Sequence, residues 1–140
     1  MSLADTKIIY GSAATAGGFT NEESWTKVTY DFSDDTGATA DYDIFTAGAD
    51  LVITDYYMSV STTVTSPAGA ILDVGLTDGG VELGSNITTA TLAAGYVVGF
   101  PAGGVTKLRV AKDSDVVMGI ESSTFTAGVI DFYFKTKFEG

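Results

Sequence analysis

Hydrophobic and polar residues alternate with a period of two along much of the chain. The closing segment Thr126–Glu139 shows this most clearly. Its apolar positions are Ile130, Phe132, Phe134 and Phe138, and the positions between them are Asp131, Tyr133, Lys135 and Lys137. Successive side chains of a β-strand point to opposite faces of the sheet, so this alternation predicts a strand with one buried face.

Shorter segments repeat this pattern and bring the predicted number of strands to about eight. The others are Trp25–Phe32, Thr39–Phe45, Asp50–Thr65, Ala70–Leu76, Tyr96–Phe100, Val105–Ala111 and Val116–Glu121. Asp50–Thr65 is long enough to form one extended or bent strand. The remaining segment Ser85–Ala94 could hold a short helical turn, but its threonines disfavour helix. The pattern therefore predicts an all-β protein, an antiparallel β-sandwich or a jelly-roll-like fold.

The tetrapeptide FTAG occurs twice, at 45–48 and at 125–128, each time before an apolar run. Similar Thr/Pro-Ala-Gly triplets stand at 15–17, 67–69 and 101–103. Proline presets the backbone for a turn, and glycine adopts the left-handed conformation that closes one. We expect these glycines to mark turns that lead into strands. Their irregular spacing favours recurrent turn chemistry over an internal repeat.

The length of 140 residues is typical of one domain with a substantial core. We divide the chain into an N-terminal arm with a flexible connector, residues 1–24, and a β-sandwich domain, residues 25–140. Gly11–Gly18 has the composition of the connector. Ile8, Ile9 and Tyr10 would then form a short arm that adds to the sheet edge of a neighbouring molecule. The alternative is that this segment pairs as an edge strand within its own sheet.

Composition narrows the classes of function. The 18 acidic and seven basic residues give a net charge of −11, which disfavours binding to nucleic acid. The chain has no cysteine and no histidine, so disulfides and the usual thiolate or imidazole sites are absent. No apolar run approaches the ~20 residues of a membrane helix. The N-terminus lacks the pattern of a secretory signal, so we expect the chain to stay in the cytoplasm that makes it.

Acidic residues gather between residues 31 and 43, as Asp31, Asp34, Asp35, Asp41 and Asp43. Their oxygens could bind calcium, but the spacing lacks the glycine and final glutamate of a helical calcium loop, which favours a solvated acidic turn. Asp41 and Asp43 share one face of a predicted strand, roughly 7 Å apart, a separation that glycosidases use. No motif for a substrate cleft accompanies them. We therefore expect neither an enzyme nor a bound cofactor.

Two adjacent tyrosines, Tyr56 and Tyr57, point to opposite faces of their predicted strand. One of them therefore faces outward. We take Tyr57 as a candidate contact with a sugar or with a neighbouring subunit, although an outward tyrosine is also common on an ordinary surface.

Two segments resemble small structural proteins of tailed bacteriophages. Phe45–Gly80 has their Ala-Gly turn, a strand of apolar residues and threonine, a DVG strand and a Gly/Asp loop, and Thr126–Gly140 resembles their terminal strand. The first forty residues do not match the group. The resemblance implies a virion protein, assembled in the host cytoplasm, that decorates or cements a capsid. It also implies a symmetric oligomer, often a trimer, that contacts the major capsid protein or another virion protein.

One other class of function stays open. A β-sandwich can carry a recognition site in which an exposed aromatic ring, with neighbouring Asp or Asn side chains, binds a carbohydrate on a host surface. Such a module would sit in a tail or fibre and would present a local concave site. A cement protein would instead use a broad surface shared between symmetry-related copies.

Overall fold

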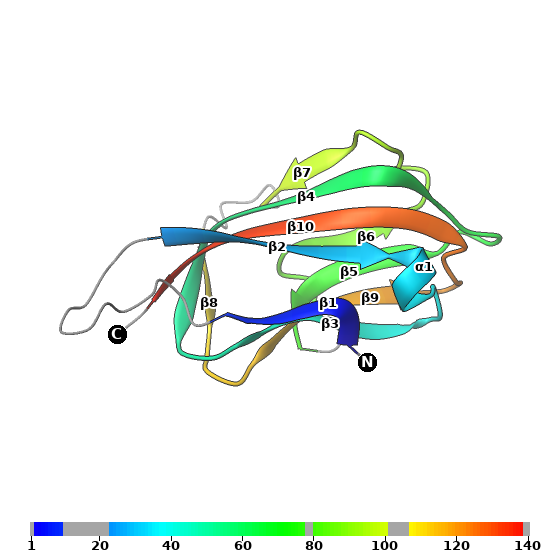
Figure 1. The fold of residues 1–140 in the computed structure, drawn as a ribbon. Helices are drawn as coiled ribbons and strands as arrows, with labels where there is room; N and C mark the ends of the chain where they lie inside the picture. The colour runs from blue at the N-terminus through cyan, green and yellow to red at the C-terminus, as the bar shows by residue number, and fades with distance from the viewer. Residues whose placement is uncertain (1, 10–22, 78–79, 101–106, 139–140) are drawn as a thin grey trace.

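Two stacked β-sheets make up the protein in the computed structural model, which describes residues 2–9, 23–77, 80–100 and 107–138 (Figure 1). Sheet A has the order β1 (Ser2–Ile9), β3 (Ala40–Ala47), β9 (Asp115–Glu121), β5 (Ile71–Leu76) and β6 (Gly84–Thr88). Sheet B has the order β2 (Glu23–Asp31), β10 (Ala127–Phe138), β4 (Leu51–Thr65) and β7 (Val97–Gly99), and β8 (Leu108–Val110) also pairs with β4. The predicted all-β sandwich is confirmed.

Each of the eight predicted strands is present. The alternation in β10 is confirmed, since Ile130, Phe132 and Phe134 are fully buried and the residues between them face outward. Phe138, predicted to lie on the buried face, is only half-buried at the end of the strand. Two further strands, β1 and β6, were not among the eight. β6 occupies the start of the segment in which a helical turn was considered and disfavoured.

One turn of helix, α1 (Phe32–Asp35), follows β2 directly. Its start is fixed by Asp31, whose carboxylate accepts a hydrogen bond from the Ser33 N–H at 3.0 Å. The turn ends at Thr36, which has a φ of 63° and donates its N–H to the Phe32 carbonyl. The prediction that Phe32 belongs to the preceding strand was therefore wrong, because the cap at Asp31 turns the chain. No helix in the described residues is long and apolar enough to cross a membrane.

Aromatic rings fill the space between the sheets. Phe45 of sheet A meets Phe134 of sheet B edge to face, with ring centroids 4.9 Å apart, and Tyr56 lies against Phe134 at 5.3 Å. Tyr30 packs against Phe125 at 6.0 Å, and its buried hydroxyl donates to the Thr36 carbonyl at 2.6 Å. Such pairs add about 0.5–1.5 kcal/mol each beyond the burial of their area. The core therefore fixes the two outer faces of the sandwich relative to each other.

The two FTAG segments have different roles. At 45–48 the tetrapeptide ends β3, and at 125–128 it begins β10. Gly69 and Gly128 have positive φ angles, of 75° and 131°, as the turn prediction requires. Gly48 does not, so the prediction of a left-handed glycine was wrong there. The triplets at 15–17 and 101–103 lie outside the described residues.

The N-terminal segment is part of the chain's own sheet. Residues 7–9 of β1 pair in parallel with residues 45–47 of β3, and the Gly48 N–H donates to the Ile9 carbonyl at 2.7 Å. The other side of β1 approaches β2 of sheet B, where the Lys7 ammonium donates to the Lys27 carbonyl. Of the two alternatives for this segment, pairing at the edge of its own sheet is the one observed. The connector lies outside the described residues, and the domain boundary at residue 24 stays a prediction.

Candidate functional site

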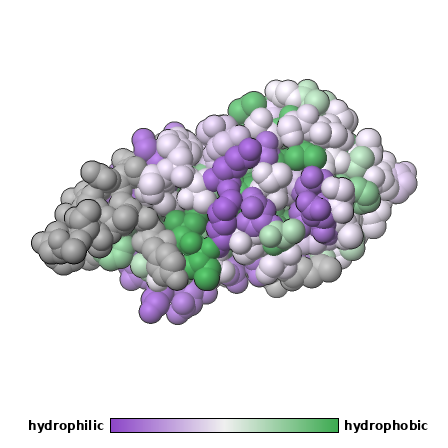
Figure 2. Space-filling model, in the orientation of Figure 1, coloured by the Kyte–Doolittle hydropathy of each residue, from purple (hydrophilic) through white to green (hydrophobic). Residues whose placement is uncertain are grey.

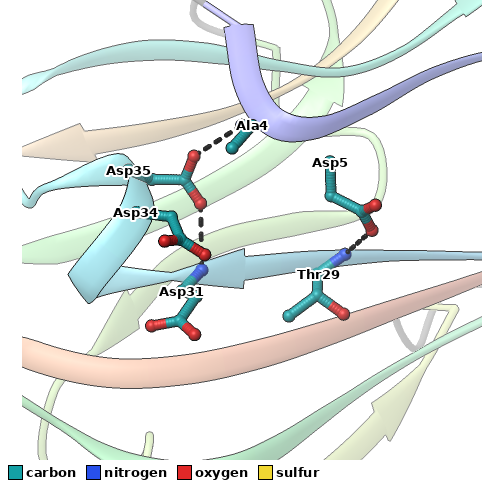
Figure 3. Close-up of a pocket in the computed structure, with 6 residues that line it drawn as sticks. All are labelled: Ala4, Asp5, Thr29, Asp31, Asp34 and Asp35. Carbon is teal, nitrogen blue, oxygen red and sulfur yellow. Dashed lines mark hydrogen bonds between the residues drawn. The ribbon is translucent and has the colours of Figure 1, made fainter.

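A pocket of about 320 Å³ lies where β1, β2 and α1 meet (Figure 3). Its walls carry four carboxylates, and the full lining is Ala4, Asp5, Thr29, Asp31, Asp34 and Asp35. Of the five acidic residues singled out in the sequence, Asp31, Asp34 and Asp35 are thus brought together. Asp41 and Asp43 lie apart from them, on β3 of sheet A.

Carboxylates of this pocket accept hydrogen bonds from backbone N–H groups. Asp35 accepts hydrogen bonds from the N–H groups of Ala4 at 2.6 Å and Asp31 at 3.0 Å, so it ties β1 to β2 (Figure 3). Asp5 accepts from the Thr29 N–H at 2.8 Å. Among the described residues, no group of three or more His, Cys, Asp or Glu side chains has the arrangement of a metal site. The pocket is therefore a structural joint between the sheets.

The outer face of sheet A is acidic. Strands β3, β9, β5 and β6 contain no lysine or arginine. Asp41, Gly119 and Asp73 lie side by side in one row across β3, β9 and β5. Asp73 is 5% exposed and accepts a hydrogen bond from the Asn86 N–H at 2.7 Å.

Glu121 lies beside this row on β9. A hydrogen bond with the Asp73 carboxyl raises the pKa of Glu121, and repulsion from the charges of Asp73 and Asp41 adds to the effect. Asp41 and Asp43 do share a strand face, as the sequence indicated, but neither lines the pocket of Figure 3. Among the described residues, the strands of this face therefore carry acidic side chains and no lysine or arginine.

Part of the same face is covered by the chain itself. The backbone of Gly80 and Val81 lies over Gly75 so closely that a Cβ atom at Gly75 would be 2.4 Å from the Gly80 carbonyl carbon. The Glu82 carboxylate accepts from the Leu76 N–H at 3.0 Å and holds the segment down. Glycine at position 75 is required by this close approach.

The outer face of sheet B has an aromatic centre. Tyr57 on β4 and Tyr133 on β10 are direct cross-strand partners, and their rings stack with centroids 4.4 Å apart at an angle of 12°. Trp25 on β2 meets Tyr57 edge to face at 5.6 Å. These three rings, with the lysines described next, are called the aromatic face.

Two lysines complete the aromatic face. The Lys27 ammonium lies 5.9 Å from the centre of the Tyr133 ring, and the Lys135 ammonium lies 5.9 Å from the Trp25 ring. Figure 2 shows a band of hydrophilic side chains over this sheet, between hydrophobic patches. Trp25 is 48% exposed although it is the one tryptophan of the chain. Tryptophan is enriched among the residues that dominate protein contacts, so this half-exposed indole is a candidate contact residue.

The four residues proposed from sequence as contacts lie in different places. Tyr57 faces outward and Tyr56 is buried, so the division between the two tyrosines is as predicted. Ile8 is 59% exposed, whereas Ile9 is 5% exposed and belongs to the core. Tyr10 lies outside the described residues. Whether any of them contacts a partner stays a prediction.

The contact residues proposed from the sequence did not include Trp25, Tyr133, Lys27 or Lys135. The alternation in β2 and β10 places all four on outward positions, so the signal was present in each strand separately. What was missing is the register, which sets Tyr133 opposite both Tyr57 and Lys27. Cross-strand neighbours cannot be paired before the order of the strands is known.

Several solved capsid structures contain chains with this fold. A chain of the cyanophage Pam1 capsid asymmetric unit aligns with a TM-score of 0.64 and 14% identity, over 91% of this chain and 92% of that chain. A chain of the capsid of Ralstonia phage GP4 aligns with a TM-score of 0.63 and 17% identity, over 94% and 92%. The acidic stable capsid of Helicobacter pylori bacteriophage KHP30 gives 0.57 and 8%, over 84% and 89%.

No protein-family model matches the chain, and no curated protein matches it significantly. The likeness to the capsid chains is therefore one of fold, and it extends over nearly the whole length of both partners in each alignment. The two-sheet sandwich described above is similar to a fold that occurs in the capsids of bacteriophages infecting different hosts.

Proposed function

We propose that the protein is a structural, non-enzymatic component of a bacteriophage virion that decorates or cements the capsid shell. Its partner is the major capsid protein or another virion protein, and it binds as a symmetric oligomer, with a trimer favoured. It is made and assembled in the host cytoplasm. The observation that carries the proposal is the alignment, end to end, with chains of phage capsids.

The chemistry of the molecule agrees with a passive role. The carboxylates of the pocket in Figure 3 accept backbone hydrogen bonds, and Asp41 and Asp43 lie on a sheet face away from it. A closed sandwich with two broad outer faces offers large contact surfaces, which suit binding to a shell. The two resembling sequence segments, Phe45–Gly80 and Thr126–Gly140, support the same class of protein.

The test is sedimentation with capsid shells. Shells of the phage that encodes this chain, prepared without it, are mixed with the purified protein and pelleted. We expect saturable binding at a fixed ratio to the shell protein, and a higher melting temperature of the decorated shells. Protein that stays in the supernatant at every concentration would overturn the proposal. A β-sandwich protein of equal size and charge serves as the control for trapping.

One observation favours the carbohydrate alternative, namely the half-exposed ring of Trp25. The arrangement of the neighbouring rings weakens the carbohydrate alternative, because sugars stack on the flat face of an aromatic ring. The faces of Tyr57 and Tyr133 are stacked on each other, and Lys27 lies over Tyr133. We therefore expect no binding on a glycan array. A ligand whose binding is lost in Trp25→Ala would favour the recognition module instead.

A further inference from the structure

The aromatic face is the strongest feature of the surface that the proposed function leaves without a role. Trp25 lies on the edge strand β2 and Val97 on the edge strand β7, with exposed fractions of 48% and 57%. Val97 is the cross-strand partner of Ser59, so both side chains lie on the outer face. Apolar surface therefore flanks the Tyr57–Tyr133 stack on both sides.

The balance of acidic and basic residues differs between this face and the rest of the chain. Among the described side chains at the outward positions of sheet B, four are basic (Lys27, Lys135, Lys137 and Arg109) and three are acidic (Asp31, Asp55 and Asp131). The whole chain has a net charge of −11. Two copies that approach each other through an acidic surface repel more strongly than two copies that approach through this face.

The outer face of sheet A differs from the aromatic face in its charge. In sheet A, strands β3, β5 and β9 carry acidic side chains, and neither they nor β6 carry a basic one. A second acidic chain could not lie on that face without placing like charges against each other.

We propose that the aromatic face is the surface through which copies of this chain associate with one another. This deepens the proposed function and rests on it, because a decorating oligomer needs one surface for its own copies and another for the shell. Tyr57 lies in the middle of the contact, and Trp25 and Val97 supply apolar surface at its two edges. The lysines and aspartates around them have both signs, so a lysine of one copy can face an aspartate of the next.

The ring geometry favours a protein partner over a planar ligand. Trp25 presents a broad indole surface that a pocket on another copy can cover, and tryptophan and tyrosine are the residues that most often dominate protein contacts. The Tyr57–Tyr133 stack is already formed within one copy. Association therefore requires little further ordering of these side chains.

The experiment compares one substitution on the two sides of the sandwich. Val97→Glu places a carboxylate at the edge of the aromatic face, and Val81→Glu places the same group over sheet A, where Val81 is 46% exposed. Both valines are on the surface, so both variants should fold, which circular dichroism checks. Mass and self-association are measured by light scattering and analytical ultracentrifugation.

We expect the unmodified chain to be an oligomer, Val97→Glu to raise its dissociation constant by about tenfold or more, and Val81→Glu to leave it unchanged. Trp25→Ala, which adds no charge, should weaken association in the same direction. Raising the salt concentration should strengthen it, because salt screens the repulsion between the acidic remainders.

Three results would overturn the inference. They are a chain that stays monomeric at high concentration, an oligomer that survives both Val97→Glu and Trp25→Ala unchanged, and an oligomer that Val81→Glu disrupts as strongly. Sedimentation with shells is a separate readout. A monomer that still pellets with shells would contradict the inference and the proposed oligomer but keep the proposed binding to the capsid. An oligomer that does not pellet with shells would contradict that binding and keep the inference.

Discussion

Tyr57 and Asp73 hold comparable positions on the two outer faces of the sandwich. Each lies on an inner strand of its sheet, β4 for Tyr57 and β5 for Asp73, with strands paired on both sides. Tyr57 stacks on a second ring, whereas Asp73 lies next to Gly119 and close to a second carboxyl group. The same backbone arrangement therefore supports one aromatic face of mixed charge and one acidic face. The chemistry of the two faces suits different kinds of neighbour.

The largest effect is expected at a glycine of the acidic face. Gly75→Ala should lower the free energy of unfolding by about 2–3 kcal/mol, because the added Cβ meets the backbone of Gly80 and Val81. Gly99→Ala is the matched change on the aromatic face. Its Cβ would lie 3.2 Å from the Tyr56 carbonyl oxygen, so we expect a change of less than about 1 kcal/mol. Denaturant unfolding measures both free energies. Equal losses would contradict the claim that the backbone of Gly80 and Val81 leaves no room for a side chain at position 75.

The Asp35 carboxylate joins the two sheets where β1 meets β2. Asp35→Ala removes the acceptor of the Ala4 and Asp31 N–H groups and should cost about 1–3 kcal/mol. The adjacent Asp34 is exposed, so Asp34→Ala should change stability by less than about 0.5 kcal/mol. Hydrogen exchange should then show faster exchange in β1 of the Asp35 variant. Unchanged protection there would mean that the joint does not depend on Asp35.

A double-mutant cycle tests whether the aromatic face is ordered before it meets a partner. Tyr57→Ala and Tyr133→Ala, alone and together, should give a coupling energy of about 0.5–1.5 kcal/mol for the stack. The unfolding is measured at a protein concentration at which the chain is monomeric. Additive losses would show that the two rings do not stabilise each other in the single copy.

The smallest effect is expected from the carboxyl pair of the acidic face. The pKa of Glu121 is higher in the folded chain than its ordinary value of 4.5. The folded state therefore holds its proton longer, and the free energy of unfolding should fall as the pH rises from about 4.5 through the raised pKa of Glu121. Glu121→Gln should remove this decline, and Asp55→Asn on the aromatic face should keep it. Titration of stability against pH between 4 and 7 checks the difference.

The strands could be predicted from the sequence because burial of one sheet face produces alternating apolar and polar residues. Ile130, Phe132 and Phe134 alternate with polar residues since one face of β10 meets the core. The short helix after Asp31 could not be read in this way, because it depends on one side-chain cap and buries no residue. The parallel pairing of β1 with β3 also left no local signal, since it joins segments nearly forty residues apart.

The candidate surface was predicted less well, for a related reason. The outward position of Tyr57 followed from alternation, but its neighbours follow from strand order. Trp25, Tyr57 and Tyr133 come from three separate strands. Their assembly is a property of register, which a single strand does not encode.

The carboxylates around β2 have a consequence for crowded assemblies. At the outer edge of this strand, the Lys27 carbonyl and the N–H groups of Thr29 and Asp31 already have side-chain partners in Lys7, Asp5 and Asp35. An exposed strand edge is a template on which another chain can form a cross-β aggregate. With these backbone groups occupied, the edge of β2 is a poor template for such pairing when many copies are concentrated at one place.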